Sequence, residues 1–182
     1  TKKDGLVGFG DFEVIYNGDN LGTDTYPTNA GTYAVVVKVE EGDNYTGATL
    51  ELGNLTISEK SITENDVEVT LPTTWDEADE DKDYDYETVY NGEVQKLTSA
   101  IIKTGITGVI EEKYYFANGT NADGSIKWQA FGENEYPQNA GLYKAVVISN
   151  GTVNYTGTVT LEYTYKITPR QITFKIDDKG SI

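Results

Sequence analysis

The stretch YPTNAGTYAVVVKVEEGDNYTG, from Tyr26 to Gly47, occurs again as YPQNAGLYKAVVISNGTVNYTG from Tyr136 to Gly157. Twelve of the 22 aligned positions are identical, without a gap, at a constant offset of 110 residues. Similarity at a fixed offset is the signature of a repeated structural unit. We therefore expect two related modules in this chain of 182 residues.

The residues that follow each copy alternate between apolar and polar. Every second residue from Val159 to Ile167 is apolar, and the residues between them are Thr, Glu, Thr and Lys. Tyr33 to Val39 show a similar pattern in the first copy. Strict alternation is the period of a strand with one buried and one solvent-facing side. Asn-Gly turns separate such runs, and no stretch has a helical apolar period, so the sequence predicts an all-β chain.

One predicted strand changes phase in its middle. Leu50 and Leu52 have one parity, whereas Leu55 and Ile57 have the other. A slip of one residue would turn a whole apolar face outward. We therefore predict a β-bulge near Gly53, where the absent Cβ eases insertion of an extra residue.

The repeated stretch begins with a tight corner of Pro, Asn, Ala and Gly, followed by Tyr33 in the first copy and Tyr143 in the second. This corner resembles the E–F corner of immunoglobulin-like sandwiches, where a Tyr at the start of strand F bonds back to the backbone. The Asn-Tyr-Thr-Gly segments would then connect strand F to strand G.

These motifs together carry a family resemblance. Asn-Ala-Gly-x-Tyr, then Asn-Tyr-Thr-Gly, then a strand ending in Lys-Ile-Thr-Pro resembles the bacterial immunoglobulin-like repeats of the MBG type. The resemblance covers about residues 13–60 and 86–176. It implies a β-sandwich, a tandem arrangement in large secreted or cell-wall-attached proteins, and a non-catalytic role. It implies no ligand, because the shared residues are structural.

The predicted fold is thus a tandem of immunoglobulin-like β-sandwich modules, of which the first is incomplete in sequence. Residues 1–59 form the first, partial module, and residues 60–169 form the second, with two insertions. Residues 170–182 are the start of a third repeat or a C-terminal strand, because Gln171-Ile172-Thr173 matches Ser61-Ile62-Thr63 at the same offset. The junction of Ser58 to Lys60 leaves no room for a flexible linker.

Composition argues against several functions. Fourteen basic and 30 acidic residues give a formal net charge of −16, which repels nucleic acids and anionic membranes. No run approaches the roughly 20 apolar residues of a membrane-spanning helix, so we expect no membrane insertion. Without His or Cys the chain lacks the usual catalytic triads, thiolate zinc ligands and disulfides. We expect neither an enzyme nor a cofactor.

The first insertion is the acidic stretch TTWDEADEDKDYDYE, from Thr73 to Glu87. Its alternating Asp residues suggest calcium, but Tyr84 and Tyr90 stand where an EF-hand loop needs Gly and Glu. We expect a solvated loop and an edge strand whose other side carries Tyr84 and Tyr86. A weak calcium site of another type remains an alternative.

The second insertion lengthens the distance from Asn-Gly to Tyr-Pro. Tyr26 lies eight positions after Gly18, but Tyr136 lies 17 positions after Gly119. Insertions between framework strands often carry binding function. The two Trp residues of the chain lie in the two insertions. The candidate ligand-binding residues are Trp128, Phe131, Trp75, Tyr84 and Tyr86, and we expect no metal ligands.

Two functional hypotheses follow. The chain is a spacer in the stalk of a bacterial surface protein, or it is a module that binds a polysaccharide, a starch-like α-glucan or a host or cell-wall glycan, through exposed aromatic rings. In the second case Trp128 is an exposed stacking platform; in the first it packs beside Phe131. Both place the protein outside the cell. Because the sequence starts at Thr1 and contains no Met, we expect a monomeric part of a longer multidomain chain.

Overall fold

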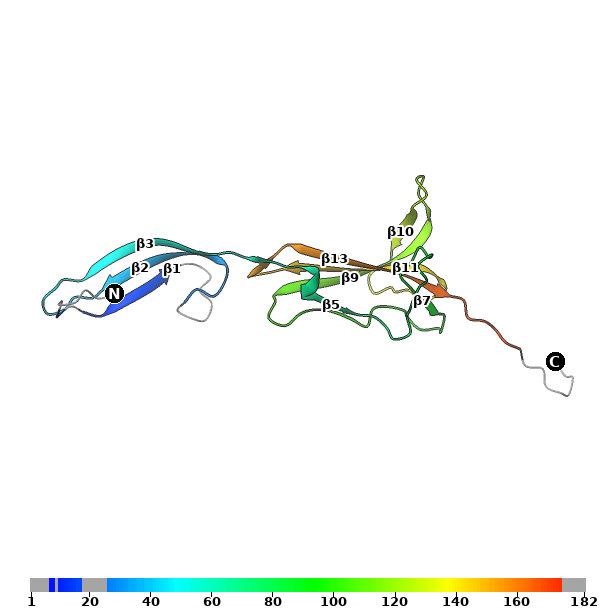
Figure 1. Ribbon diagram of the computed structural model, residues 1–182, viewed down its shortest axis with the longest axis horizontal. Helices are drawn as coiled ribbons and strands as arrows, with labels where there is room; N and C mark the ends of the chain where they lie inside the picture. The colour runs from blue at the N-terminus through cyan, green and yellow to red at the C-terminus, as the bar shows by residue number, and fades with distance from the viewer. Residues whose placement is uncertain (1–6, 9, 18–25, 175–182) are drawn as a thin grey trace. The chain divides into compact units, whose positions relative to one another are not determined.

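The computed structural model describes residues 7–8, 10–17 and 26–174, which form two units (Figure 1). Unit 1 comprises residues 1–61 together with 151–157, and unit 2 comprises residues 62–150 and 158–182. Almost every regular element is a strand, and the only helical element among the described residues is the short 3₁₀ helix η1 (Glu64–Asp66). The predicted all-β class is confirmed. No helix in this part of the chain is long and apolar enough to cross a membrane.

Unit 1 is built on one antiparallel sheet. Its strands lie side by side in the order β1-β2-β3 (Figure 1). They are β1 (Phe12–Asn17), β2 (Gly31–Val39) and β3 (Ala48–Ile57). Two short strands of the same unit, β4 (Lys60–Ser61) and β12 (Tyr155–Thr156), form a parallel pair.

The predicted bulge is present in β3. Glu51 and Gly53 pair with consecutive residues of β2, so Leu52 is left as the extra residue. Gly53 has a φ of 97°, a left-handed conformation that glycine adopts without steric cost. The bulge keeps Leu50 and Leu55 on one face of the sheet, although their positions in sequence have opposite parity.

The predicted tyrosine corner is present in both units. The hydroxyl of Tyr33 donates a hydrogen bond of 2.8 Å to the carbonyl oxygen of Asn29. The hydroxyl of Tyr143 donates one of the same length to the carbonyl oxygen of Asn139. Both rings are buried, so each hydroxyl needs a partner in the protein. The corner closes the turn that leads into β2 in unit 1 and into the corresponding strand in unit 2.

Unit 2 has two sheets. The larger has six strands in the order β10-β9-β11-β13-β7-β6, and the smaller pairs β5 with β8. The β9–β10 hairpin projects from the rest of the larger sheet (Figure 1). In chain order the strands are β5 (Val67–Thr70), β6 (Asp76–Glu77), β7 (Tyr86–Val89), β8 (Ser99–Ile102), β9 (Gly108–Thr120), β10 (Ile126–Ala130), β11 (Gly141–Gly151) and β13 (Thr158–Thr168).

The core of unit 2 lies between these two sheets. Val67 from β5 belongs to the same buried cluster as Val147 from β11 and Tyr165 from β13. In β13 the alternate residues from Val159 to Ile167 point inward, as predicted, and the residues between them point outward. Burying apolar surface stabilises the fold by roughly 25 cal/mol per Å², so this two-sided packing is the main stabilising feature of the unit.

The described part of the C-terminal segment, from the end of β13 to Phe174, contains no strand. The sequence predicts the start of a third repeat or a C-terminal strand over residues 170–182. Ile172 is 77% exposed, Phe174 is 90% exposed, and neither belongs to a strand. Ile176 lies outside the described residues, as does Gly18 of one predicted Asn-Gly turn.

Candidate functional site

The five candidate binding residues fall on opposite faces of the large sheet of unit 2. Trp75, Tyr86 and Phe131 make ring contacts on the core face. Trp128 and Tyr84 lie on the outer face, each near a lysine. The structure therefore does not gather the five into one site. Of the five side chains, only that of Trp75 is buried, and the other four are partly exposed.

The prediction that Trp75 is an exposed ligand-binding residue is wrong. Its side chain is only 8% exposed, and its ring stacks on Tyr165 with centroids 4.0 Å apart. A turn closed by the Trp75 N–H and the Pro72 carbonyl starts the acidic segment here. The indole N–H donates to Gln95 at 3.4 Å, which satisfies its polar atom inside the core. Trp75 is a core residue.

The alternation predicts that Tyr84 and Tyr86 lie on the same side of one strand. In the structure they do not. Tyr86 pairs with Tyr165 in β13 and faces the core, where burial raises the pKa of its hydroxyl. Tyr84 precedes β7, and its hydroxyl donates to Glu87 at 3.3 Å while Lys166 lies over its ring. Strand β7 is also not an edge strand, because β6 pairs with its free side. The two-residue β6 takes the edge position.

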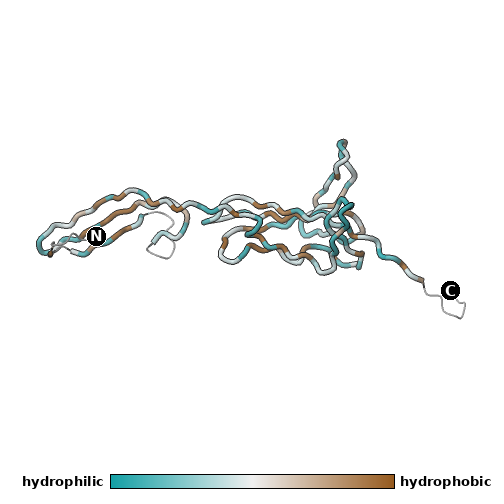
Figure 2. Tube along the Cα trace, viewed as in Figure 1, coloured by the Kyte–Doolittle hydropathy of each residue, from teal (hydrophilic) through white to brown (hydrophobic). Residues whose placement is uncertain are grey.

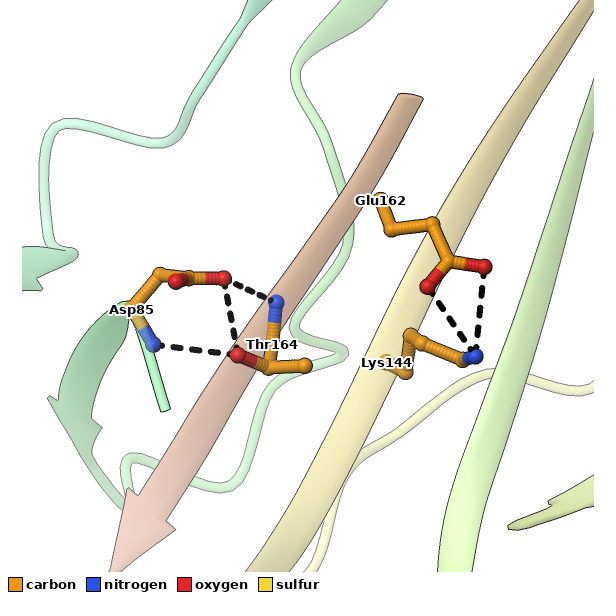
Figure 3. Close-up of polar contacts among 4 residues, drawn as sticks. All are labelled: Asp85, Lys144, Glu162 and Thr164. Carbon is orange, nitrogen blue, oxygen red and sulfur yellow. Dashed lines mark hydrogen bonds and ion pairs between the residues drawn. The ribbon is translucent and has the colours of Figure 1, made fainter. Parts of the chain in front are cut away.

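Asp85 ties the acidic segment to the sheet. One of its carboxylate oxygens accepts hydrogen bonds from the backbone N–H and the hydroxyl of Thr164, at 2.8 and 2.7 Å (Figure 3). The backbone N–H of Asp85 donates in turn to the Thr164 carbonyl at 2.9 Å. Among the described residues no group of three or more acidic side chains is placed to hold a metal ion. Asp85 therefore anchors the acidic segment to β13.

Phe131 packs inward beside the hairpin. Its ring lies 5.2 Å from that of Phe116 and 6.1 Å from that of Tyr143. It also lines a hollow of about 400 Å³ between β9 and the loop that follows β10. The Tyr114 ring lines the same hollow, and burial together with its hydrogen bond to Glu112 raises the pKa of its hydroxyl. Four carboxylates line the hollow as well: Glu111, Glu112, Glu133 and Glu135.

Trp128 stands on β10, opposite Ala117 of β9, and is partly buried. The predicted packing beside Phe131 is not found. Trp128 makes no ring contact with Phe131 among the described residues, because the two side chains occupy opposite faces of the sheet. The Lys144 ammonium lies 5.4 Å from the centre of the Trp128 ring.

Lys144 is the centre of this outer-face cluster. Its ammonium lies 3.2 and 3.3 Å from the two carboxylate oxygens of Glu162 on the neighbouring strand (Figure 3). It also lies 5.5 Å from the ring centre of Tyr115, which places it between two aromatic rings. Only 16% of its side chain is exposed. A cation held close to ring faces and a carboxylate is attracted by both.

Sequence reasoning did not find Tyr115, Lys144 or Glu162. All three sit at outward positions of neighbouring strands, where charged and polar residues are expected merely because the face is wet. Their grouping depends on the pairing register, which sets Lys144 opposite Thr164, two residues from Glu162. One signal was present: Lys144 replaces Ala34 of the first copy at the 110-residue offset. A charged residue that only one copy has on a repeated framework strand indicates a candidate site.

Comparison with known proteins supports the family resemblance. Residues 7–61 match the protein family described as the MBG domain. The predicted MBG-type resemblance is confirmed over this stretch, which includes all three strands of the unit 1 sheet. The chain thus contains an MBG-type repeat module. Neither the curated proteins nor the solved structures gave a match.

Proposed function

We propose that the chain is a non-catalytic spacer from the extracellular part of a bacterial surface protein. The observation that carries this proposal is that the residues shared by the two copies have framework roles. Tyr33 and Tyr143 make the same corner bond, and the Asn-Ala-Gly corners and Asn-Tyr-Thr-Gly turns connect strands. A module kept for its framework alone suits a stalk. The match to the MBG domain supports a repeat module of a surface protein.

Contacts at the junction between β3 and β4 support it further. The Asn154 side chain accepts a hydrogen bond from the Ala30 N–H at 2.6 Å and donates one to Asn29 at 3.0 Å. The Asn154 carbonyl accepts from the Lys60 N–H at 2.9 Å. One turn therefore bonds both the tyrosine corner of unit 1 and the chain that leaves β3. Such bonds restrict bending of the two residues between β3 and β4.

A surface-display experiment tests the spacer role. The fragment is inserted between a cell-wall anchor and a peptide epitope on a bacterial surface, and antibody access to the epitope is measured. We expect greater access than with a Gly/Ser linker of the same residue number, because a flexible coil grows only with the square root of its length. Access no better than with the flexible linker would contradict the proposal.

A second candidate function is polysaccharide binding on the outer face of unit 2. The observation that favours it is the cluster of Trp128 and Tyr115 around Lys144. Sugars are bound by aromatic rings that cover their apolar face and by charged or amide groups that bond their hydroxyls. Lys144 occupies one side of the two rings, so a sugar would stack on the other side of Trp128.

Binding measurements separate the two candidates. Retention on insoluble α-glucan, followed by a panel of soluble polysaccharides, is compared for the native chain, Trp128→Ala and Tyr115→Ala. Tyr90→Ala is the matched control, because Tyr90 is exposed but lies outside the cluster. Loss of retention in the cluster variants alone would establish the glycan site. Equal retention of all four proteins on every glycan would exclude it and leave the spacer role.

A further inference from the structure

The β9–β10 hairpin has an edge that no described strand covers. Strand β10 is the last strand of the six-stranded sheet, so its outer side has no partner strand among the described residues. The opposite edge strand, β6, has two residues, and both are acidic. Strand β10 has five residues, and none of them is acidic. An exposed edge of this length offers unpaired backbone groups to another strand, and natural sheets usually protect such edges.

The backbone groups that face this open edge follow from the pairing with β9. The Phe131 N–H, just after β10, donates to the Tyr114 carbonyl of β9 at 2.9 Å. Along an antiparallel strand the backbone groups alternate between the two sides. The register shift of the hairpin places its extra residue in β9, so β10 itself stays regular. The N–H and C=O groups that point away from β9 are therefore those of Ile126, Trp128 and Ala130.

These three residues make β10 complementary to a second copy of itself. In an antiparallel register centred on Trp128, the Trp128 residues of the two copies lie opposite each other. Ile126 of each copy then lies opposite Ala130 of the other. Each of these pairs can exchange two backbone hydrogen bonds, so every backbone group on the open edge gains a partner.

Charge opposes this contact less at the hairpin than elsewhere on the chain. From Tyr114 to Ala130 there is one acidic residue, Asp123, and one basic residue, Lys127, whereas the whole chain has a formal net charge of −16. In the register centred on Trp128, Lys127 lies opposite Gln129 of the other copy, so no like charges face each other directly. The hairpin also projects from the rest of the sheet (Figure 1), which leaves the more acidic parts of two copies apart.

The same register gives the Trp128 ring a partner. Lys144 belongs to β11, on the far side of β9, so its ammonium approaches the ring from the side away from the open edge. The second Trp128 approaches from the side of the open edge. Aromatic residues directly opposite each other on antiparallel strands stabilise the pairing. A bound sugar would need the same side of Trp128, so the two uses of this ring exclude each other.

We propose that two copies of the chain form a two-fold symmetric dimer by pairing their β10 strands antiparallel about Trp128. The contact is isologous, because each copy contributes the same edge, and it is complete with two copies. A pair of five-residue strands buries less surface than the roughly 1,200 Å² of small specific interfaces, so we expect a weak dimer in place of the monomer that the sequence alone predicts. The inference goes beyond the proposed spacer role and does not depend on it.

Cysteine cross-linking tests the register, since the native chain has no Cys. Lys127→Cys and Gln129→Cys proteins are mixed, oxidised and run on a non-reducing gel. The proposal predicts a disulfide-linked dimer, because residues opposite each other in a non-hydrogen-bonded pair have Cα atoms about 4.5 Å apart, within reach of a disulfide. Either variant alone should link several-fold more slowly, since its two cysteines are diagonal neighbours about 7–8 Å apart. Glu77→Cys, on the β6 edge of the same sheet, is the control and should not link to Gln129→Cys.

Sedimentation velocity over a range of high protein concentrations gives the second measurement. Ala130→Pro should weaken association about tenfold or more, because it removes an N–H that faces the partner strand and none that faces β9. Trp128→Ala should weaken association as well, and Trp128→Phe, which keeps an aromatic ring, should weaken it less. Tyr90→Ala removes an exposed aromatic ring outside the hairpin and should leave association unchanged. Circular dichroism confirms that each variant is folded.

The two measurements can each contradict the dimer. Equal cross-linking of Gln129→Cys with Lys127→Cys and with Glu77→Cys would overturn the proposed register. Association that Ala130→Pro does not change, association that continues beyond a dimer, or no association at any concentration tested would overturn the proposal as a whole.

Discussion

The sheet of unit 1 and the middle of the large sheet of unit 2 are two versions of one structure. The order β1-β2-β3 corresponds to β9-β11-β13, and the corner before β2 has the same bond as the corner before β11. Pairing is also equivalent: Tyr33 faces Leu55 in unit 1, and Tyr143 faces Tyr165 in unit 2.

The two differ in what lies over the apolar face. In unit 2 the β5–β8 pair and Trp75 cover it, and Tyr165 is fully buried. In unit 1 no described strand takes the place of β5 and β8, and Phe12 is 57% and Leu50 60% exposed. Figure 2 shows the hydrophobic residues that run along β1 and β2. The described residues of unit 1 therefore leave part of this apolar face exposed.

The comparison separates local from long-range determinants. The corner, the bulge and the antiparallel pairing are present in unit 1, whose described residues include no second layer, because each is set by a few neighbouring residues. Burial of the face requires strands that lie before the corner in sequence, as residues 62–116 do in unit 2. Substitutions at equivalent positions of the two units should therefore have unequal effects wherever burial decides stability.

The two units should differ most in the loss of stability caused by substituting Tyr165 and its counterpart Leu55. Tyr165→Ala removes a ring stacked on Trp75 and a hydroxyl bonded to the Gln95 carbonyl, and should lower the free energy of unfolding of unit 2 by about 3–5 kcal/mol. Leu55 is 40% exposed, so Leu55→Ala should cost unit 1 about 1 kcal/mol or less. Denaturant unfolding measures both.

The probes can be kept separate in that experiment. Trp75 and Trp128 both lie in unit 2, so tryptophan fluorescence follows that unit alone. Amide exchange in β1–β3 follows unit 1. Equal losses for Tyr165→Ala and Leu55→Ala would mean that the face of unit 1 is covered in solution, and the contrast between the units would fail.

Alkaline pH should also act on unit 2. Burial raises the pKa of the Tyr114 and Tyr165 hydroxyls above the ordinary value of 10.0. In the unfolded chain these groups lose their protons near pH 10, whereas in the folded chain they keep them. Their contribution to stability is therefore complete below pH 10 and falls as pH rises above it, by about 1.4 kcal/mol per pH unit for each group.

Unfolding titrations at pH 9, 10 and 11, followed by tryptophan fluorescence, measure this slope. Tyr165→Phe is the control, since it keeps the ring and removes one titrating hydroxyl. Above pH 10 the free energy of unfolding of the variant should fall less steeply with pH than that of the native chain. The difference in slope should be about the contribution of one tyrosine hydroxyl. An unchanged slope would show that Tyr165 titrates as freely in the folded chain as in the unfolded chain.

A smaller effect, and an equal one, is expected at the two tyrosine corners. Tyr33→Phe and Tyr143→Phe each remove one hydrogen bond of 2.8 Å from a buried hydroxyl and leave a carbonyl without it. Each should cost its own unit about 1 kcal/mol, because the bond is local and does not depend on the second layer. Amide hydrogen exchange near Asn29 and Asn139 measures the stability of the two corners. A loss confined to Tyr143→Phe would mean that the corner needs the covering strands.

Much of this fold can be predicted from the sequence because its determinants are short. The offset of 110 residues, the alternation in β13 and the parity change at Gly53 each specify a local geometry that the structure contains. The partners of β7 could not be predicted. Tyr86 pairs in parallel with Tyr165, 79 residues away, and no turn motif links the two strands.

The candidate site was harder to predict for the same reason. Trp75 is a candidate binding residue from sequence because it lies in an insertion, but the turn at Pro72 directs its ring into the core. Trp128 is a candidate from sequence because it lies in the second insertion, whereas its neighbours Tyr115 and Lys144 come from other strands. Which residues share a sheet face depends on register, and register follows from pairings that are distant in sequence.

The smallest effect on folding should come from Leu50→Lys in unit 1. Leu50 faces Val37 on the open face, is 60% exposed and stands on β3, an edge strand among the described residues. A lysine can lay its methylenes along the apolar face and keep its ammonium in water. The free energy of unfolding of unit 1 should therefore change by about 0.5 kcal/mol or less. In unit 2, Leu161 pairs with Val147 as Leu50 pairs with Val37, and it packs against the core. Leu161→Lys should therefore lower the free energy of unfolding several times more. Amide exchange in β2 and tryptophan fluorescence measure the two variants at low protein concentration. A large loss of stability for Leu50→Lys under these conditions would mean that this face is buried within a single chain, and the contrast with unit 2 would have to be abandoned.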